Sequence, residues 1–136
     1  MADGRQVNIR GTIDRVDQRA SQVRVIDYKT GFVDASKLKV SGMHQLRQPE
    51  DRNKSLQLMT YAWLYLQNNT VDSVTAGIIS LRNARQWLLP LTYQKEDVLT
   101  REHTLTYQAF LTELLEEIYN PDIPISKNPL TLQSDE

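Results

Sequence analysis

The sequence contains no cysteine, and this absence removes several kinds of structure at once. Without thiols the chain has neither a disulfide framework nor a zinc or iron–sulfur centre built on thiolates. A surplus of charge is also missing, because 16 Lys and Arg stand against 17 Asp and Glu, for a net charge of -1. Proteins that bind nucleic acid through bulk charge carry a basic excess, so any affinity of that kind here has to be local.

Long hydrophobic runs are absent as well, and the first residues lack the apolar stretch of a signal peptide. We therefore expect a cytoplasmic location. The 136 residues are 40% hydrophobic and 24% charged, which is ordinary for a globular protein. A chain of this length buries about two-thirds of its unfolded surface in one core, so we expect a single domain over residues 1–136.

Two runs rich in β-branched and apolar residues, Gly11–Asp17 and Val23–Gly31, are the most informative part of the sequence. The polar residues between them have turn composition, so the pattern predicts a β-hairpin with Arg19–Gln22 as its loop. In that register Asp14 falls directly opposite Asp27, and the two acids share one face of the hairpin.

Directly opposed residues in an antiparallel pair have Cβ atoms roughly 4.5–5.5 Å apart, and like charges there repel. Lys29 follows Asp27 by two residues, so it lies on the same face and supplies one positive charge. A divalent cation between the two carboxylates would supply the rest, and hard oxygen ligands favour magnesium or manganese. The alternative is a pair of surface acids on a solvated hairpin. Apolar neighbours on both faces argue against it: Val16, Val25, Ile13, Ile26 and Tyr28.

Three motifs follow one another in a specific order: G-x-I-D-R-V-D from Gly11, V-I-D-Y-K-T-G from Val25, and Q-x-x-x-Y over Gln57–Tyr61 on a predicted helix. Together they resemble the PD-(D/E)XK nuclease superfamily, and specifically its RecB-like (AddB/RecB-type) branch. The resemblance implies an α/β fold, with a mixed central β-sheet and flanking helices in a restriction-endonuclease-like core.

The resemblance also implies a role for each motif residue. Asp14 and Asp27 would bind Mg2+ or Mn2+ together with the backbone carbonyl of Tyr28, and Lys29 would complete the catalytic set. Further residues would position the substrate phosphate or brace the metal ligands, namely Gln57, Tyr61 and Thr30. Arg15 and Asp17 point away from the acids, and we interpret them as a structural pair.

The implied activity is that of a metal-dependent, exonuclease-type deoxyribonuclease in DNA repair or recombination. Its partners would be DNA and the other domains or subunits of a helicase–nuclease. The alternative is a catalytically inactive domain that binds DNA or a partner subunit. Only six residues precede Val7, where the family has a further helix with another ligand. The chain is therefore either a piece of a longer protein or incomplete at its site. We expect such a piece to bind metal weakly, to cleave DNA poorly and to self-associate.

Alternation from Val7 predicts that the first strand begins there, and Gly11 interrupts it where a close neighbour is expected. The stretch Phe32–Asn53 has no period and predicts an extended loop with a short strand at Leu38–Val40. This loop either faces the substrate or is disordered. Its basic residues, with Lys29, are candidates for local nucleic-acid contact or an ordinary solvated loop: Lys37, Lys39, Arg47, Arg52 and Lys54.

The remaining elements follow from periodicity. We expect a helix over Asn53–Asn68 capped by Asn53 or Ser55, a buried strand over Val74–Leu81, a turn at 82–85 and an edge strand over Gln86–Leu91. Helical spacing then runs from Leu99 to Ile118 and stops at Asn120–Pro121. We interpret Trp87 as a packing residue and His103 as a core-edge residue or helix cap. His44 is interpreted as a loop residue, with metal or substrate contact as the alternative.

Overall fold

The computed structural model describes residues 4, 6–82 and 87–122. Three predictions fall wholly or partly outside these ranges: the frayed N-terminal stretch, the turn at 82–85 and the proline-containing tail after residue 122. The elements are, in chain order, β1 (Arg15–Arg19), β2 (Gln22–Lys29), the 3-10 helix η1 (Ala35–Leu38), β3 (Lys39–Val40), the 3-10 helix η2 (Met43–Arg47), α1 (Pro49–Asn68), β4 (Ser73–Ser80), β5 (Leu89–Pro90), β6 (Thr92–Tyr93), β7 (Val98–Thr100) and α2 (Arg101–Tyr119).

The predicted hairpin is present as β1 and β2, and its register is the predicted one, with Asp17 opposite Arg24. The turn is shorter than predicted: two residues, 20 and 21, connect the strands, and Ala20 has a positive φ of 54°. The first strand was also predicted too long, because residues 7–14 form an extended segment without strand pairing. Asp14 therefore lies in a bend just before β1.

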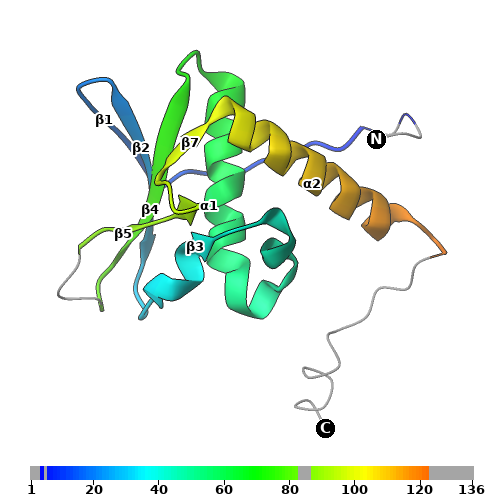
Figure 1. The fold of residues 1–136 in the computed structure, drawn as a ribbon, viewed down its shortest axis with the longest axis horizontal. Coiled ribbons are helices and arrows are strands. Elements are labelled where there is room, and N and C mark those ends of the chain that lie inside the picture. Colours follow the sequence, from blue (N-terminus) through cyan, green and yellow to red (C-terminus); the bar gives the residue numbers. More distant parts are fainter. Residues whose placement is uncertain (1–3, 5, 83–86, 123–136) are drawn as a thin grey trace, which may run out of the picture.

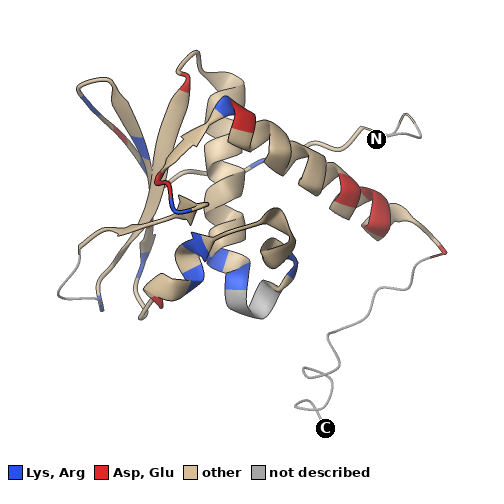
Figure 2. Ribbon diagram, in the orientation of Figure 1, with Lys and Arg blue, Asp and Glu red and all other residues tan. Residues whose placement is uncertain are grey.

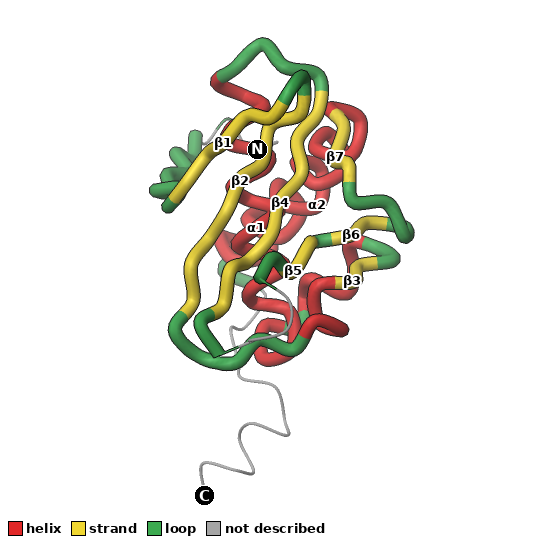
Figure 3. Tube along the Cα trace, turned by 90° about the vertical axis from the view of Figure 1, so that its left-hand side faces the viewer, coloured by secondary structure: helices red, strands yellow, loops and turns green. Residues whose placement is uncertain are grey.

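The central sheet is mixed, as predicted. β2 pairs antiparallel with β1 and parallel with β4, and the second edge of β4 is shared between β5 and β7. Parallel neighbours need a long crossover connection, which here contains α1. Figure 3 shows β2 and β4 running side by side and ending together in the loops at the bottom of the view.

Both α-helices lie on the same side of the sheet (Figure 1). One face of β2 and β4 packs against α1, and α2 packs against α1 and against β7 of the same sheet. None of the helices in the described ranges is long and apolar enough to cross a membrane. The core joins the sheet to both helices through Val23, Val25, Val74, Ala76, Ile78, Leu58, Met59, Ala62, Leu66, Leu99, Tyr107 and Phe110.

Helix α1 begins at Pro49, four residues before the predicted start, and Gln48 precedes it as the N-cap residue. Proline suits the first helical position, because its missing N–H would have no partner there and its φ is already helical. Ser55, predicted as a cap, is instead buried one turn inside the helix and donates a 2.5 Å hydrogen bond to the carbonyl of Lys37. This bond ties the segment before α1 to the helix.

The segment between β2 and α1 was predicted as an extended loop, and that prediction is wrong except for its short strand. It folds into η1, β3 and η2, and β3 pairs in parallel with β6. Hydrophobic residues at irregular spacing, which gave no periodic signal, place this segment in the core: Val33, Leu38, Val40, Met43 and Leu46.

Two predictions for the C-terminal half need correction, and two are confirmed. Leu99 belongs to β7 rather than to the helix, whereas α2 ends at Tyr119, directly before Asn120, as predicted. Trp87 is not a packing residue, since 61% of its surface is exposed and the Arg24 guanidinium lies 5.4 Å from its ring centroid. His103 is a cap as expected: Thr100 N donates to its Nδ1, and His103 N donates to Thr100 Oγ1, both at 3.2 Å.

Candidate active site

The hairpin brings the two predicted acids together at the open end of β1. Asp27 points toward α1 with Val25 and is only 4% exposed, while Asp14 is exposed in the bend before β1. The backbone N–H of Tyr28 donates a 2.9 Å hydrogen bond to Asp14 Oδ2. Asp14 precedes β1, which begins at Arg15. Its side chain therefore accepts the bond that a backbone carbonyl of a longer β1 would accept, and this bond holds Asp14 beside Asp27.

Lys29 connects these acids to the Q-x-x-x-Y helix. Its ammonium lies 2.8 Å from Asp27 Oδ2 and donates a 2.9 Å hydrogen bond to Gln57 Oε1. Gln57 Nε2 in turn donates to the hydroxyl of Tyr61 at 2.9 Å, across one turn of α1. The contact with Asp27 is a short ion pair, and its buried Oδ2 has no other hydrogen-bond donor among the described residues.

The pKa values of the two carboxyl groups are displaced in opposite directions. The hydrogen bond from the Tyr28 N–H lowers the pKa of Asp14 below its ordinary 3.8. A hydrogen bond with the Asp27 side chain and the positive charge of Lys29 lower this pKa further. Burial raises the pKa of Asp27, Lys29 opposes this shift, and the adjacent Asp14 adds to it. Two neighbouring carboxyls with separated pKa values are typical of functional sites rather than of a solvated surface pair.

The backbone carbonyl of Tyr28 points to the same edge of β2 as the Tyr28 N–H that holds Asp14. The next carbonyl, that of Lys29, accepts a 3.1 Å hydrogen bond from Leu81 N on the opposite side, next to β4. Since the N–H and C=O of one strand residue point the same way and successive residues alternate, the Tyr28 carbonyl lies on the Asp14 side.

These donors fit a divalent cation. They are all oxygens, two of them from carboxylates, and among the described residues the buried Asp27 Oδ2 has no hydrogen-bond donor besides the Lys29 ammonium. Hard oxygen ligands of this kind suit magnesium or manganese. The protein's share of the ligands is small, because the described residues contain no group of three or more His, Cys, Asp and Glu side chains that could hold a metal.

Gly11 supports this network from the N-terminal side. A Cβ atom there would lie 2.9 Å from Tyr61 Cε1 and 3.3 Å from Leu64 Cδ1, so a larger residue would force the Tyr61 ring to move. The predicted close neighbour of Gly11 is therefore Tyr61 itself. The crossing segment fixes the ring whose hydroxyl bonds Gln57.

Two predicted site residues lie apart from the network. The Tyr28 side chain is 44% exposed, and its hydroxyl accepts a 3.2 Å hydrogen bond from Arg15. Thr30 is exposed in the bend after β2. Arg15 also approaches Asp17 at 3.7 Å, but the principal partner of Asp17 is Arg24, with two bonds of 2.8 Å.

The basic residues proposed for nucleic-acid contact separate into two groups. Arg52 donates to the carbonyls of Lys37 and Lys39, and Arg47 pairs with Glu117, so both arginines are engaged in holding the fold. Figure 2 shows Lys and Arg gathered at η1 and the first turns of α1. Lys39, the first residue of β3, is exposed. His44 is exposed in η2, and its suggested contact stays a prediction.

Ser80 was missed by the sequence analysis. Its side chain is 5% exposed, donates a 2.6 Å hydrogen bond to the carbonyl of Gly31 and accepts one of 3.2 Å from Arg82 N. It thereby fixes the backbone that follows Lys29. The only signal was a serine at the end of an otherwise apolar strand.

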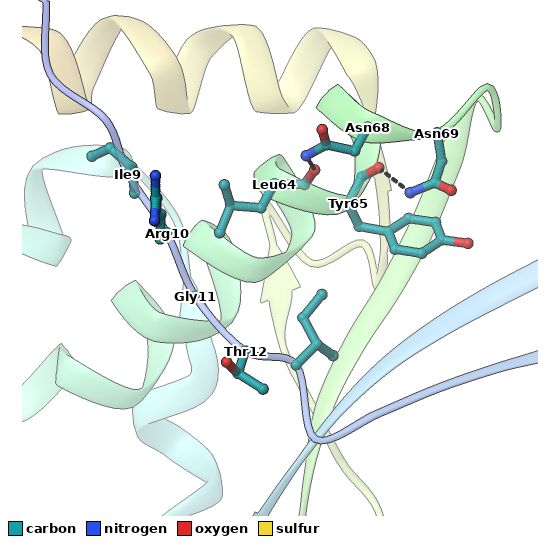
Figure 4. A pocket seen from close by; sticks show the side chains of 9 residues that line it. Ile9, Arg10, Gly11, Thr12, Leu64, Tyr65, Asn68 and Asn69 are labelled. Carbon is teal, nitrogen blue, oxygen red and sulfur yellow. Dashed lines mark hydrogen bonds between the residues drawn. The ribbon is translucent and has the colours of Figure 1, made fainter.

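A cavity of about 660 Å3 lies between the N-terminal segment and the last turns of α1 (Figure 4). Its lining residues include no carboxylate: Ile9, Arg10, Gly11, Thr12, Ile13, Leu64, Tyr65, Asn68 and Asn69. Asn68 and Asn69 donate to backbone carbonyls of α1. The site defined by chemistry is therefore the network around Lys29, and not this cavity.

A mixed sheet that carries two acids and a lysine on one hairpin, with a glutamine and a tyrosine on the crossover helix, defines a class of phosphodiester-cleaving domains. Comparison with known families matches residues 1–130 to the PD-(D/E)XK nuclease superfamily. The chain belongs to this superfamily, and the fold is the predicted restriction-endonuclease-like α/β fold. No curated protein and no solved structure shows a significant match.

Proposed function

We propose that this chain is the nuclease domain of a metal-dependent deoxyribonuclease of the RecB-like branch. The observation that carries the proposal is the Lys29 ammonium, which lies between the buried Asp27 and Gln57 of α1. Burial disfavours the ionised form of Asp27 and raises its pKa. Perturbed pKa values of this kind are typical of catalytic sites. Membership of the superfamily supports nuclease activity on DNA in general terms.

The metal would be held by Asp14, Asp27 and the carbonyl of Tyr28. When bound, Mg2+ or Mn2+ supplies a water of lowered pKa and positive charge for the phosphate oxygens. The chain's own residues do the rest. Lys29 orients the attacking water or stabilises the negative charge that develops on the phosphate. Gln57 fixes the ammonium of Lys29, Tyr61 fixes Gln57, and the exposed Thr30 hydroxyl contacts a substrate phosphate.

The finer assignments rest on the resemblance of the motifs. They are exonuclease-type cleavage, a role in DNA repair or recombination, a cytoplasmic location, and assembly with the other domains or subunits of a helicase–nuclease. On the same basis we propose that residues 1–136 are one domain of a longer protein. The sheet face opposite α1, which carries the exposed Tyr28 and Trp87, supports the proposal that the isolated chain self-associates.

A second candidate function is a catalytically inactive domain that binds DNA or a partner subunit. Two observations favour it: the small number of metal-ligating side chains among the described residues and the net charge of -1. Magnesium gives up its waters reluctantly, so a site with few protein ligands holds it weakly.

The two functions are separated by one set of measurements. Cleavage of single- and double-stranded DNA is compared for wild type, Asp27→Asn and Lys29→Ala with magnesium or manganese, and metal binding is titrated by calorimetry for wild type and Asp14→Asn. Catalysis predicts metal binding that Asp14→Asn weakens and cleavage that both other variants lose. Equal cleavage by all three proteins would exclude the catalytic assignment, and absence of binding at millimolar metal would favour the inactive domain.

A further inference from the structure

The two most exposed large hydrophobic side chains of the described residues follow the ends of two neighbouring strands. Phe32 is 70% exposed and Leu81 is 77% exposed. Phe32 lies just beyond the end of β2 and Leu81 just beyond the end of β4, and these strands are parallel neighbours. Both residues therefore lie at the carboxyl end of the sheet, the usual place for ligands in sheets with parallel strands.

Hydrogen bonds between the ends of β2 and β4 hold the backbone around both residues close to the proposed catalytic lysine. Leu81 N donates to the carbonyl of Lys29 at 3.1 Å, and the neighbouring Ser80 hydroxyl donates to the carbonyl of Gly31 at 2.6 Å. Phe32 follows Lys29 by three residues, so its backbone lies within roughly 10 Å of it. A single nucleic-acid strand rises about 3.4 Å per nucleotide in a duplex, so this distance spans about three nucleotides.

The exposure of these side chains is not that of a loose loop. Val33, which follows Phe32, is 1% exposed in the core, and Ser80, which precedes Leu81, is 5% exposed. Each exposed residue is thus anchored by a buried neighbour.

We propose that Phe32 and Leu81 bind unpaired nucleobases beside the phosphate that the enzyme cleaves. The inference rests on the proposed function and adds a preference for single strands or frayed ends. An aromatic ring stacks on any base face, but in a duplex those faces are covered by neighbouring pairs. Lys29 and the exposed Arg82, which follows Leu81, supply positive charge for the backbone of the same strand.

A protein partner is the competing occupant of this surface, and binding measurements distinguish the two. Fluorescence anisotropy in EDTA, where metal-dependent hydrolysis is suppressed, gives the Kd for a labelled single-stranded oligonucleotide and for the blunt duplex of the same sequence. Phe32→Ala is expected to raise the single-strand Kd by about 5- to 150-fold, because it removes a stacking ring. Leu81→Ala removes apolar contact without a ring and is expected to raise the single-strand Kd by less, and both variants are expected to leave the duplex Kd unchanged.

Two controls make the result specific. Leu105 on α2 is 61% exposed, so Leu105→Ala removes a comparable surface side chain away from the site and is expected to leave the Kd unchanged. Phe32→Tyr keeps an aromatic ring and is expected to bind as wild type, whereas Phe32→Leu is expected to resemble Phe32→Ala. With abasic nucleotides in the oligonucleotide, Phe32→Ala is expected to cause no further loss.

The inference and the proposed function fail separately. Single-strand binding that depends on Phe32 in a protein that cleaves nothing with metal supports the inference and rejects hydrolysis. Metal-dependent cleavage together with wild-type single-strand binding by both alanine variants overturns the inference alone and leaves the surface to a protein partner. An equal loss on duplex and single strand, or no single-strand binding by wild type, also overturns it.

Discussion

Lys29 on β2 and Gln57 on α1 lie 28 residues apart in the sequence, yet the lysine ammonium donates a 2.9 Å hydrogen bond to the amide oxygen. This bond connects the hairpin that carries the acids with the helix that crosses the sheet. It restrains a side chain with four rotatable bonds, because Asp27 and Gln57 contact the ammonium together. Removing either contact leaves the lysine free to adopt other rotamers.

Gln57→Ala is therefore expected to reduce DNA cleavage by about 10- to 100-fold while the protein stays folded. The measurement is the cleavage rate under saturating magnesium, with circular dichroism as the test of folding. Gln67→Ala is the matched control, because Gln67 lies on the same helix, is exposed and bonds Gln108 at the surface. If both glutamine variants cleave like wild type, Gln57 has no positioning role.

Gly11→Ala is expected to destabilise the protein by about 1–3 kcal/mol, because the added methyl overlaps the ring of Tyr61. The displaced ring would also lose its bond to Gln57, so cleavage should fall with stability. Urea denaturation gives the free energy of unfolding. Gly31→Ala is the control, since a Cβ at Gly31 meets nothing within 4 Å and should cost much less. Equal stability of the two variants would contradict the close crossing.

Asp27→Asn is expected to raise the melting temperature at pH 7 in EDTA, on the order of a few degrees. Burial raises the pKa of Asp27, so the fold disfavours its ionised form. The loss of folding stability caused by ionised Asp27 is absent below the unfolded pKa of about 3.8 and grows as pH rises through the folded pKa. Melting curves from pH 3 to pH 8 should show the two proteins diverging as pH rises. A variant that is less stable than wild type throughout would refute this account.

Asp17→Asn is expected to show the opposite pH dependence. The bidentate bond from Arg24 lowers the pKa of Asp17, so the pair adds stability above the unfolded value of 3.8 and loses it as pH falls through the lowered folded pKa. The pair is largely a surface pair, so the loss at pH 7 should be about 0.5–1 kcal/mol. Urea denaturation at pH 7 and at pH 3 gives the comparison, and an undiminished difference at pH 3 would contradict it.

The parts of the site that were predictable lie in regular strands and in the helix. Alternation and turn composition placed Asp17 opposite Arg24. Extending this register past the first pair, Arg15 and Ile26, predicts Asp14 beside Asp27, although Asp14 precedes β1 and is held by the Tyr28 N–H rather than by strand pairing. Spacing of four residues placed Gln57 and Tyr61 on one ridge of α1. These relationships are local, so the sequence contains nearly all the information that determines them.

The parts that were not predictable depend on tertiary packing. The stretch after Thr30 looked like a loop, because its buried residues have neither helical nor strand period. Tertiary contacts order it as η1, β3 and η2, namely its buried side chains, the pairing of β3 with β6 and the bonds from α1. Pro49 looked like a loop residue but begins α1. Ser80 gave almost no signal, because its importance comes from the Gly31 carbonyl, 49 residues away in the sequence. Such pairings exist only once β2 and β4 lie side by side.

The parallel pairing of β2 and β4 also determines when the site is completed as the chain folds. The β1–β2 hairpin is local, and hairpins form in about 1–10 μs, so the carboxylates can meet early. The contact between Lys29 and Gln57 needs the whole crossover to close, which is a slower, non-local step. A nascent or refolding chain therefore carries its acids before its lysine is restrained. Whatever chemistry the site performs is withheld until folding is nearly finished.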